Sequence, residues 1–124
     1  MWCIVTRVAL ILNTRQVNGH IIVEATGKLE FGESCLQLRE LAKRLTHEGG
    51  RFFVLDLSEV SSIDSAGLGL LLSIYANIRN HGGELKLLNV SKHIREMLRV
   101  MGLIHVFQMF EDENVAIRTK SPEA

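Results

Sequence analysis

Ser65 is the residue of this chain with the clearest chemical potential, because the residues around it display its hydroxyl. The run Asp64-Ser65-Ala66-Gly67-Leu68-Gly69 stands between two apolar segments. Asp and Ser are typical of helix starts, so we expect Ser65 in the first turn of a helix with its hydroxyl near solvent. Gly67 and Gly69 have no side chains that could obstruct an approaching partner. Such a hydroxyl can cap a helix, accept a phosphate or act as a nucleophile.

A phosphate on Ser65 is compatible with the start of a helix. Free backbone N–H groups and the positive end of the helix dipole stabilise an anion there, by about 0.3–1 kcal/mol at an exposed site. Phosphorylation adds roughly −1.5 to −2 charge units. Inside a contact surface, juxtaposed like charges cost several kcal/mol. We therefore expect a modification of Ser65 to block binding locally, without refolding the domain.

A catalytic role for Ser65 is disfavoured. A nucleophilic serine needs a general base and a site that stabilises an oxyanion. The chain lacks a Gly-x-Ser-x-Gly sequence, and none of its 5 histidines is clearly placed by the sequence to serve Ser65. We predict that the protein is not an enzyme.

Alternating apolar segments and turn signals predict the elements that position Ser65. We expect strands over residues 5–12, 21–25, 52–57, 84–90 and 106–110, and helices over 32–48 and 65–80, between Ser91 and Gly102, and after Asp112. The pair Asn18-Gly19 predicts a hairpin turn. Val60 and Ile63 are expected in a tight connection that leads to Ser65. Strands that alternate with helices after residue 50 imply parallel pairing, so the sheet should be mixed.

The composition limits the classes of protein to which this chain can belong. The chain has 124 residues, of which 47% are hydrophobic, enough for one domain with its own core. Lys plus Arg and Asp plus Glu number 14 each, so no broad basic face for direct nucleic-acid binding is expected.

Cysteines and apolar runs exclude two further classes. Cys3 and Cys35 form no Cys-x-x-Cys pattern, and no histidine pair has the spacing of a helical metal site, so we expect no metal or other cofactor. No apolar run reaches the ~18 residues of a membrane span. We expect a cytoplasmic protein that does not bind membranes.

The segment from Asp64 to Gly69, after a strand that ends in Leu55-Asp56-Leu57, resembles the signature of STAS domains. It is most similar to that of bacterial anti-sigma factor antagonists, and the similarity covers roughly residues 5–118. The resemblance implies an α/β STAS fold, with a mixed four- to five-stranded sheet and about four helices packed mainly on one face. We therefore expect a single domain over 1–124, with a core over 5–118 and a loose tail over 119–124.

The family resemblance also implies a function. The unphosphorylated antagonist binds an anti-sigma factor with serine kinase activity and thereby frees a sigma factor. Phosphorylation of the serine that matches Ser65 ends this binding, and a serine phosphatase resets the switch. The alternative within the same fold is a regulatory or structural subunit of a lipid-transport or stress-sensing complex, in which Ser65 never carries a phosphate.

The residues that match the family's functional positions lie in three segments. Gly27-Lys28-Leu29-Glu30 resembles a Gly-x-Leu-Asp element, with Glu30 where Asp is usual. Asp56 matches an acidic position near the switch loop, and Ala66 leaves Ser65 as the only hydroxyl of the signature. The predicted partner-binding residues are Glu30, Asp56, Asp64, Ser65, Ala66, Gly67 and Leu68. From the residues alone, Asp64 and Ser65 could be helix caps, Asp56 the end of a strand and Glu30 a solvated loop carboxylate.

Overall fold

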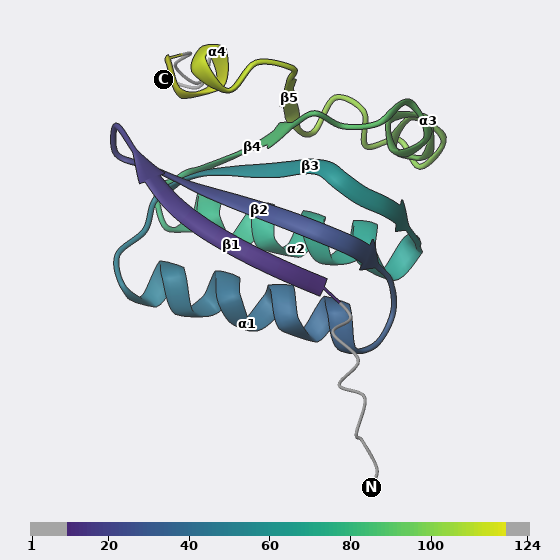
Figure 1. Ribbon diagram of the computed structural model, residues 1–124, viewed down its shortest axis with the longest axis horizontal. Coiled ribbons are helices and arrows are strands. Elements are labelled where there is room, and N and C mark those ends of the chain that lie inside the picture. Colours follow the sequence, from purple (N-terminus) through teal and green to yellow (C-terminus); the bar gives the residue numbers. More distant parts are fainter. Residues whose placement is uncertain (1–9, 119–124) are drawn as a thin grey trace, which may run out of the picture.

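A computed structural model describes residues 10–118, which form a five-stranded sheet and four helices (Figure 1). The elements, in chain order, are β1 (Leu10–Val17), β2 (His20–Leu29), α1 (Glu33–His47), β3 (Phe52–Ile63), α2 (Ser65–Asn80), β4 (Glu84–Leu88), α3 (Lys92–Val100), β5 (Gln108–Phe110) and α4 (Glu113–Arg118).

The sheet is mixed, and its strands lie in the order in which they occur in the chain. β1 and β2 form an antiparallel hairpin, while β2, β3, β4 and β5 pair in parallel. Asn18 and Gly19 turn the hairpin with φ of 50° and 81°, as a tight primed turn requires. Because β2 and β3 are parallel neighbours, their carboxyl ends meet at one edge of the sheet, where α1 and α2 both begin (Figure 1).

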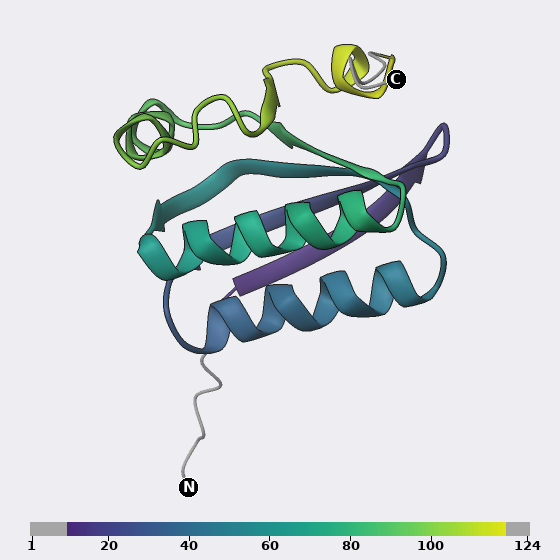
Figure 2. The same cartoon turned by 180° about the vertical axis from the view of Figure 1, so that it is seen from behind.

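The larger core lies between the sheet and the parallel helices α1 and α2, which lie side by side on one face (Figure 2). Leu38 of α1 and Leu71 of α2 are almost fully buried against this face. Ile94 and Leu98 of α3 join the same core, and Phe107 packs edge-on against Tyr75 with ring centroids 5.3 Å apart. Three of the four helices therefore serve a single apolar core.

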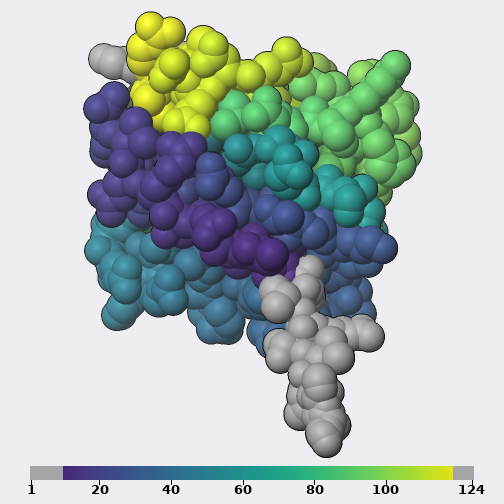
Figure 3. All heavy atoms as spheres, viewed as in Figure 1, coloured from purple at the N-terminus to yellow at the C-terminus, as the bar shows by residue number. Residues whose placement is uncertain are grey.

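The opposite face carries a smaller core beneath α4. Ile22, Val54, Leu88 and Ala116 are buried there together. Lys86, only 1% exposed, lies against α4 and donates a hydrogen bond from Nζ to the carbonyl oxygen of Ala116, at 2.7 Å. In a space-filling view, α4 lies beside the tip of the hairpin (Figure 3). These contacts attach the last helix to the centre of the sheet.

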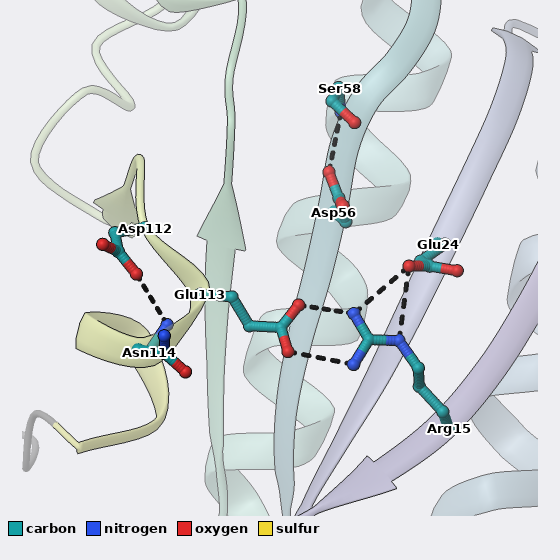
Figure 4. A network of polar contacts seen from close by, with 7 residues as sticks. All are labelled: Arg15, Glu24, Asp56, Ser58, Asp112, Glu113 and Asn114. Atoms are coloured by element: carbon teal, nitrogen blue, oxygen red, sulfur yellow. Dashed lines mark hydrogen bonds and ion pairs between the residues drawn. The ribbon is translucent and has the colours of Figure 1, made fainter.

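Arg15 makes a second attachment between the hairpin and α4 (Figure 4). Its Nη1 donates to Oε2 of Glu113 at 2.9 Å, its Nη2 to Oε1 of the same carboxylate, and its Nη2 also to Oε2 of Glu24 at 3.2 Å. The Arg15 guanidinium holds the pKa of Glu113 below its ordinary value. Since these side chains are partly exposed, the attachment contributes at most about 1 kcal/mol.

The predicted fold is confirmed, with one difference that affects the site. β3 does not end at Leu57 but continues to Ile63, so the expected loop at Val60 and Ile63 is wrong. Two register shifts against β2 change the spacing of inward side chains, and Leu57, Val60 and Ile63 are buried three residues apart instead of two. Strand alternation is therefore not visible in the sequence here. The part of the first predicted strand before Leu10 and the tail 119–124 lie outside the described residues.

We expect Glu113→Gln to lower the free energy of unfolding by up to about 1 kcal/mol at neutral pH, because it removes the carboxylate that Arg15 binds. The folded-state pKa of Glu113 is depressed, so its contribution is present above the unfolded-state value of about 4.3 and is lost as the pH falls through the lower, folded-state value. Urea unfolding of both proteins across this range should show the difference vanish in acid. Glu111→Gln is the matched control, and an equal effect of both variants would contradict the prediction.

Candidate functional site

Ser65 is the first residue of α2, and it is exposed. β3 ends at Ile63, and Asp64 adopts the extended backbone of a helix N-cap, with φ −112° and ψ −175°. The expected position of Ser65, in the first turn with an accessible side chain, is therefore confirmed. The apolar residues that follow, among them Leu68 and Leu71, fix the phase of the helix by turning into the core.

Asp64 binds two separate segments with its two carboxylate oxygens. Oδ1 accepts a hydrogen bond from the N–H of Gly67 at 2.9 Å, which caps α2, and Oδ2 accepts one from the N–H of Phe31 at 3.0 Å. The bonds from Phe31 and then Gly67 lower the pKa of Asp64. Asp64 is therefore a helix cap, and it also ties the loop between β2 and α1 to the start of α2.

Glu30 lies next to this junction and is held by two serines. Ser62 donates its hydroxyl to Oε2 of Glu30 at 2.8 Å. Ser34, which is buried, accepts a hydrogen bond from the N–H of Glu30 and donates one to its carbonyl oxygen, both at 2.9 Å. Glu30 is therefore an anchored carboxylate. A serine at the start of a helix, as Ser34 is, is a local signal for such a bond. No such local signal links Ser62 to Glu30, which is 32 positions earlier in the chain.

Gly67 and Leu68 do not lie on the surface, so the prediction that a partner contacts them directly is wrong. Leu68 is 0% exposed because the helix turns it into the core. Gly67 is buried, and a Cβ there would lie 2.4 Å from the carbonyl oxygen of Leu29 and 2.7 Å from Cγ1 of Ile63. Glycine is required at this position because α2 passes so close to the end of β2.

Asp56 lies far from Ser65, so the expected proximity to the switch loop is also wrong. It occupies the middle of β3, where it is the register partner of Glu24 and Leu88, and its Oδ1 accepts a hydrogen bond from the N–H of Ser58 at 2.9 Å (Figure 4). The strand continues to Ile63, so roughly 20 Å separate Asp56 from the start of α2. Because residues two apart in a strand point to the same face, its side chain lies on the same face as Val54, opposite α1 and α2.

The structure adds one exposed aromatic residue to the site. Phe31 is 86% exposed, although its backbone is held by Asp64. Large apolar side chains that protrude from a fixed backbone are typical anchors of protein interfaces. We call Glu30, Phe31, Asp64, Ser65 and Ala66 the α2-start surface. It combines one accessible hydroxyl, one aromatic ring and two carboxylates.

The α2-start surface lacks the partners of a catalytic serine. No histidine among residues 10–118 makes a hydrogen bond with Ser65; the ring hydrogen bonds of His20 and His81 are with the carbonyl oxygens of Asn18 and Asn77. Within the same residues, no group of three or more His, Cys, Asp and Glu side chains could hold a metal ion. None of the described helices is both long and apolar enough to cross a membrane.

The sequence and the fold are similar to those of known proteins. The family model described as STAS domain matches residues 12–116. The anti-sigma F factor antagonist of Paenibacillus polymyxa is 26% identical over 95 residues, 77% of this chain and 81% of the relative, and the anti-sigma-B factor antagonist of Bacillus subtilis is 29% identical over 92 residues, 74% of this chain and 83% of the relative.

The structure of the anti-sigma factor antagonist SpoIIAA in its unphosphorylated form has the same fold, with a TM-score of 0.74 and 23% identity. The match covers 86% of this chain and 93% of that one.

We expect Gly67→Ala to destabilise the protein by about 1–3 kcal/mol, since the added methyl group meets a backbone carbonyl that cannot turn away. Gly69→Ala is the matched control in the next turn of α2, where a Cβ meets nothing within 4 Å. Alanine is more favourable than glycine in the interior of a helix, so the free energy of unfolding of Gly69→Ala should rise by about 0.5–1 kcal/mol. Thermal or urea unfolding measures both, and equal stabilities would contradict the close approach of α2 to β2.

We expect Asp64→Ala to lower stability by about 0.5–2 kcal/mol through loss of the cap. Because the same carboxylate holds Phe31, hydrogen exchange should speed up at the amides of both Gly67 and Phe31. Faster exchange at Gly67 alone would contradict the bridging role of Asp64.

Proposed function

Because the chain belongs to the STAS domain family, we propose that it is an anti-sigma factor antagonist whose binding is switched at Ser65. In its unphosphorylated form it binds an anti-sigma factor with serine kinase activity, and a sigma factor is released. Phosphorylation of Ser65 ends this binding. The observation that carries the proposal is the exposed Ser65 hydroxyl at the capped start of α2.

The geometry around Ser65 favours modification by another protein. The hydroxyl is exposed, so a kinase can reach it without unfolding the domain. A phosphate there gains from the helix dipole and the free N–H groups of the first turn. The Asp64 carboxylate already accepts the N–H of Gly67, so the phosphate does not need to replace the cap.

The charge of the α2-start surface supports a switch that works by exclusion. Glu30 and Asp64 place two carboxylates beside Ser65 in the unmodified protein. A partner that fits this surface must accommodate two negative charges, and phosphorylation roughly doubles that charge. Phe31 protrudes from the loop that Asp64 ties to the start of α2, so we expect a partner that contacts its ring also to meet a group added to Ser65. Each ~1.4 kcal/mol of binding free energy that the phosphate removes weakens the affinity for the partner tenfold.

In this proposal the protein is the substrate of an enzyme and not an enzyme itself. The kinase supplies the ATP and the Mg²⁺, and a serine phosphatase returns Ser65 to its free form. The protein acts in the cytoplasm, where sigma factors act. The anti-sigma factor antagonists of Paenibacillus polymyxa and Bacillus subtilis support the assignment through sequence similarity over most of this chain.

We expect an anti-sigma factor kinase from the same organism, supplied with ATP and Mg²⁺, to phosphorylate the wild type and Ser61→Ala but not Ser65→Ala. Ser61 is an exposed serine in the preceding strand, so Ser61→Ala tests whether the kinase selects Ser65 over a nearby hydroxyl. Ser65→Asp should weaken binding to the kinase at least tenfold in a titration calorimetry experiment. Phosphate on another residue, or unimpaired binding by Ser65→Asp, would contradict the switch. Co-purification with a permease or its ATPase in place of a sigma regulator would support the transport-complex alternative.

A further inference from the structure

A groove lined by residues of α1 and α2 lies between these two helices, which run side by side (Figure 2). It has a volume of about 460 Å³ and lies on the side of the helices that faces away from the sheet. We call it the α1–α2 groove. Its α2 wall begins at Leu70, five residues after Ser65, and it extends to the carboxyl ends of both helices. It is therefore separate from the α2-start surface.

The α1 wall of the groove is a row of basic side chains. Arg39, Lys43 and His47 line it at positions i, i+4 and i+8 of the helix, about 6 Å apart along the axis. No acidic side chain lines the groove, and no ion pair to Arg39 or Lys43 is formed within residues 10–118. Arg39 and Lys43 therefore present positive charge that no ion pair offsets.

The α2 wall has a different character. Leu70, Ile74 and Ile78 form an apolar floor, and Ser73 and Asn77 form an uncharged rim. Arg79 is the only charged residue of the whole helix. The groove is therefore asymmetric, with positive charge along one wall and small neutral groups along the other.

We propose that the α1–α2 groove binds an acidic amphipathic helix of a partner protein. A helix with acidic residues at i, i+4 and i+8 repeats at the same ~6 Å as the basic row. Two of its carboxylates can meet the cations Arg39 and Lys43, and the third can accept a hydrogen bond from the imidazole of His47. The basic row is about 12 Å long, which corresponds to two helical turns. The neutral rim of α2 allows the backbone of the partner's helix to approach closely, as packing of ridges into grooves requires. Helices that dock in this way place their apolar side on the floor of a groove.

This inference goes beyond the switch at Ser65, because the groove contains no residue of the α2-start surface. A partner held in the groove stays bound whether or not Ser65 carries a phosphate. Such a site can keep a kinase or a further regulator close to the switch between cycles of modification, which raises its effective concentration.

The test uses the full chain and a labelled 18-residue helical peptide with Glu at i, i+4 and i+8 and Leu on the adjoining face. We expect binding by fluorescence anisotropy that weakens as salt rises and falls at least tenfold in Arg39→Glu/Lys43→Glu. Arg44→Glu, on the same helix but not lining the groove, should bind as the wild type does, and so should Ser65→Asp. Circular dichroism of each variant confirms that the protein is folded.

Three outcomes overturn the proposal. Equal binding of the same peptide with Lys in place of Glu would show that charge is not recognised. Equal binding of a peptide with a central proline would show that the occupant is not a helix. If the protein binds anionic phosphatidylglycerol vesicles through Arg39 and Lys43 but does not bind the peptide, the groove would be assigned to a lipid surface. Failure of the peptide to bind leaves the kinase reaction at Ser65 unaffected, so the two proposals can be distinguished.

Discussion

The carboxylate of Asp64 joins the two segments on which the candidate site depends. One oxygen caps α2 through Gly67, and the other holds the loop between β2 and α1 through Phe31. The two segments are far apart in sequence but meet because β2 and β3 are parallel neighbours. A single ionised group thus fixes an accessible hydroxyl and a protruding aromatic ring relative to each other.

A switch built on this junction needs no change of fold. The close approach of Gly67 to Leu29 and the two hydrogen bonds between Ser34 and Glu30 leave the backbone around Ser65 little freedom. A phosphate added to Ser65 would change the charge and volume of the surface on which the proposed partner binds, and would leave the core as it is. For the proposed switch, local electrostatics is therefore sufficient, and its cost is expected as lost affinity for the partner and not as lost stability of the fold.

The rest of the sheet is fixed by different interactions. On the face opposite α1 and α2, the buried amine of Lys86 and the guanidinium of Arg15 hold α4 across the small core. These attachments lie far from the start of α2. The side of α1 and α2 that faces away from the sheet carries the basic groove. The candidate site at the start of α2, the attachment of α4 and the basic groove thus lie on different parts of the molecule.

The sequence by itself determined the order of most elements and the position of Ser65. Apolar spacing predicted α1 and α2 within a residue or two, and the Asp-Ser pair predicted the cap, because these signals are local along the chain. The extent of β3 was not predictable, since its last residues are held by pairing with β2 and by register shifts that break the alternation.

Only the tertiary structure decided which predicted site residues share a surface. It buried Gly67 and Leu68, placed Asp56 on the opposite face of the sheet and brought Phe31 to Asp64 and Ser62 to Glu30. The physical reason is that hydrogen bonds between neighbouring strands and loops depend on topology, which joins residues about thirty positions apart, whereas motif and periodicity report only on near neighbours.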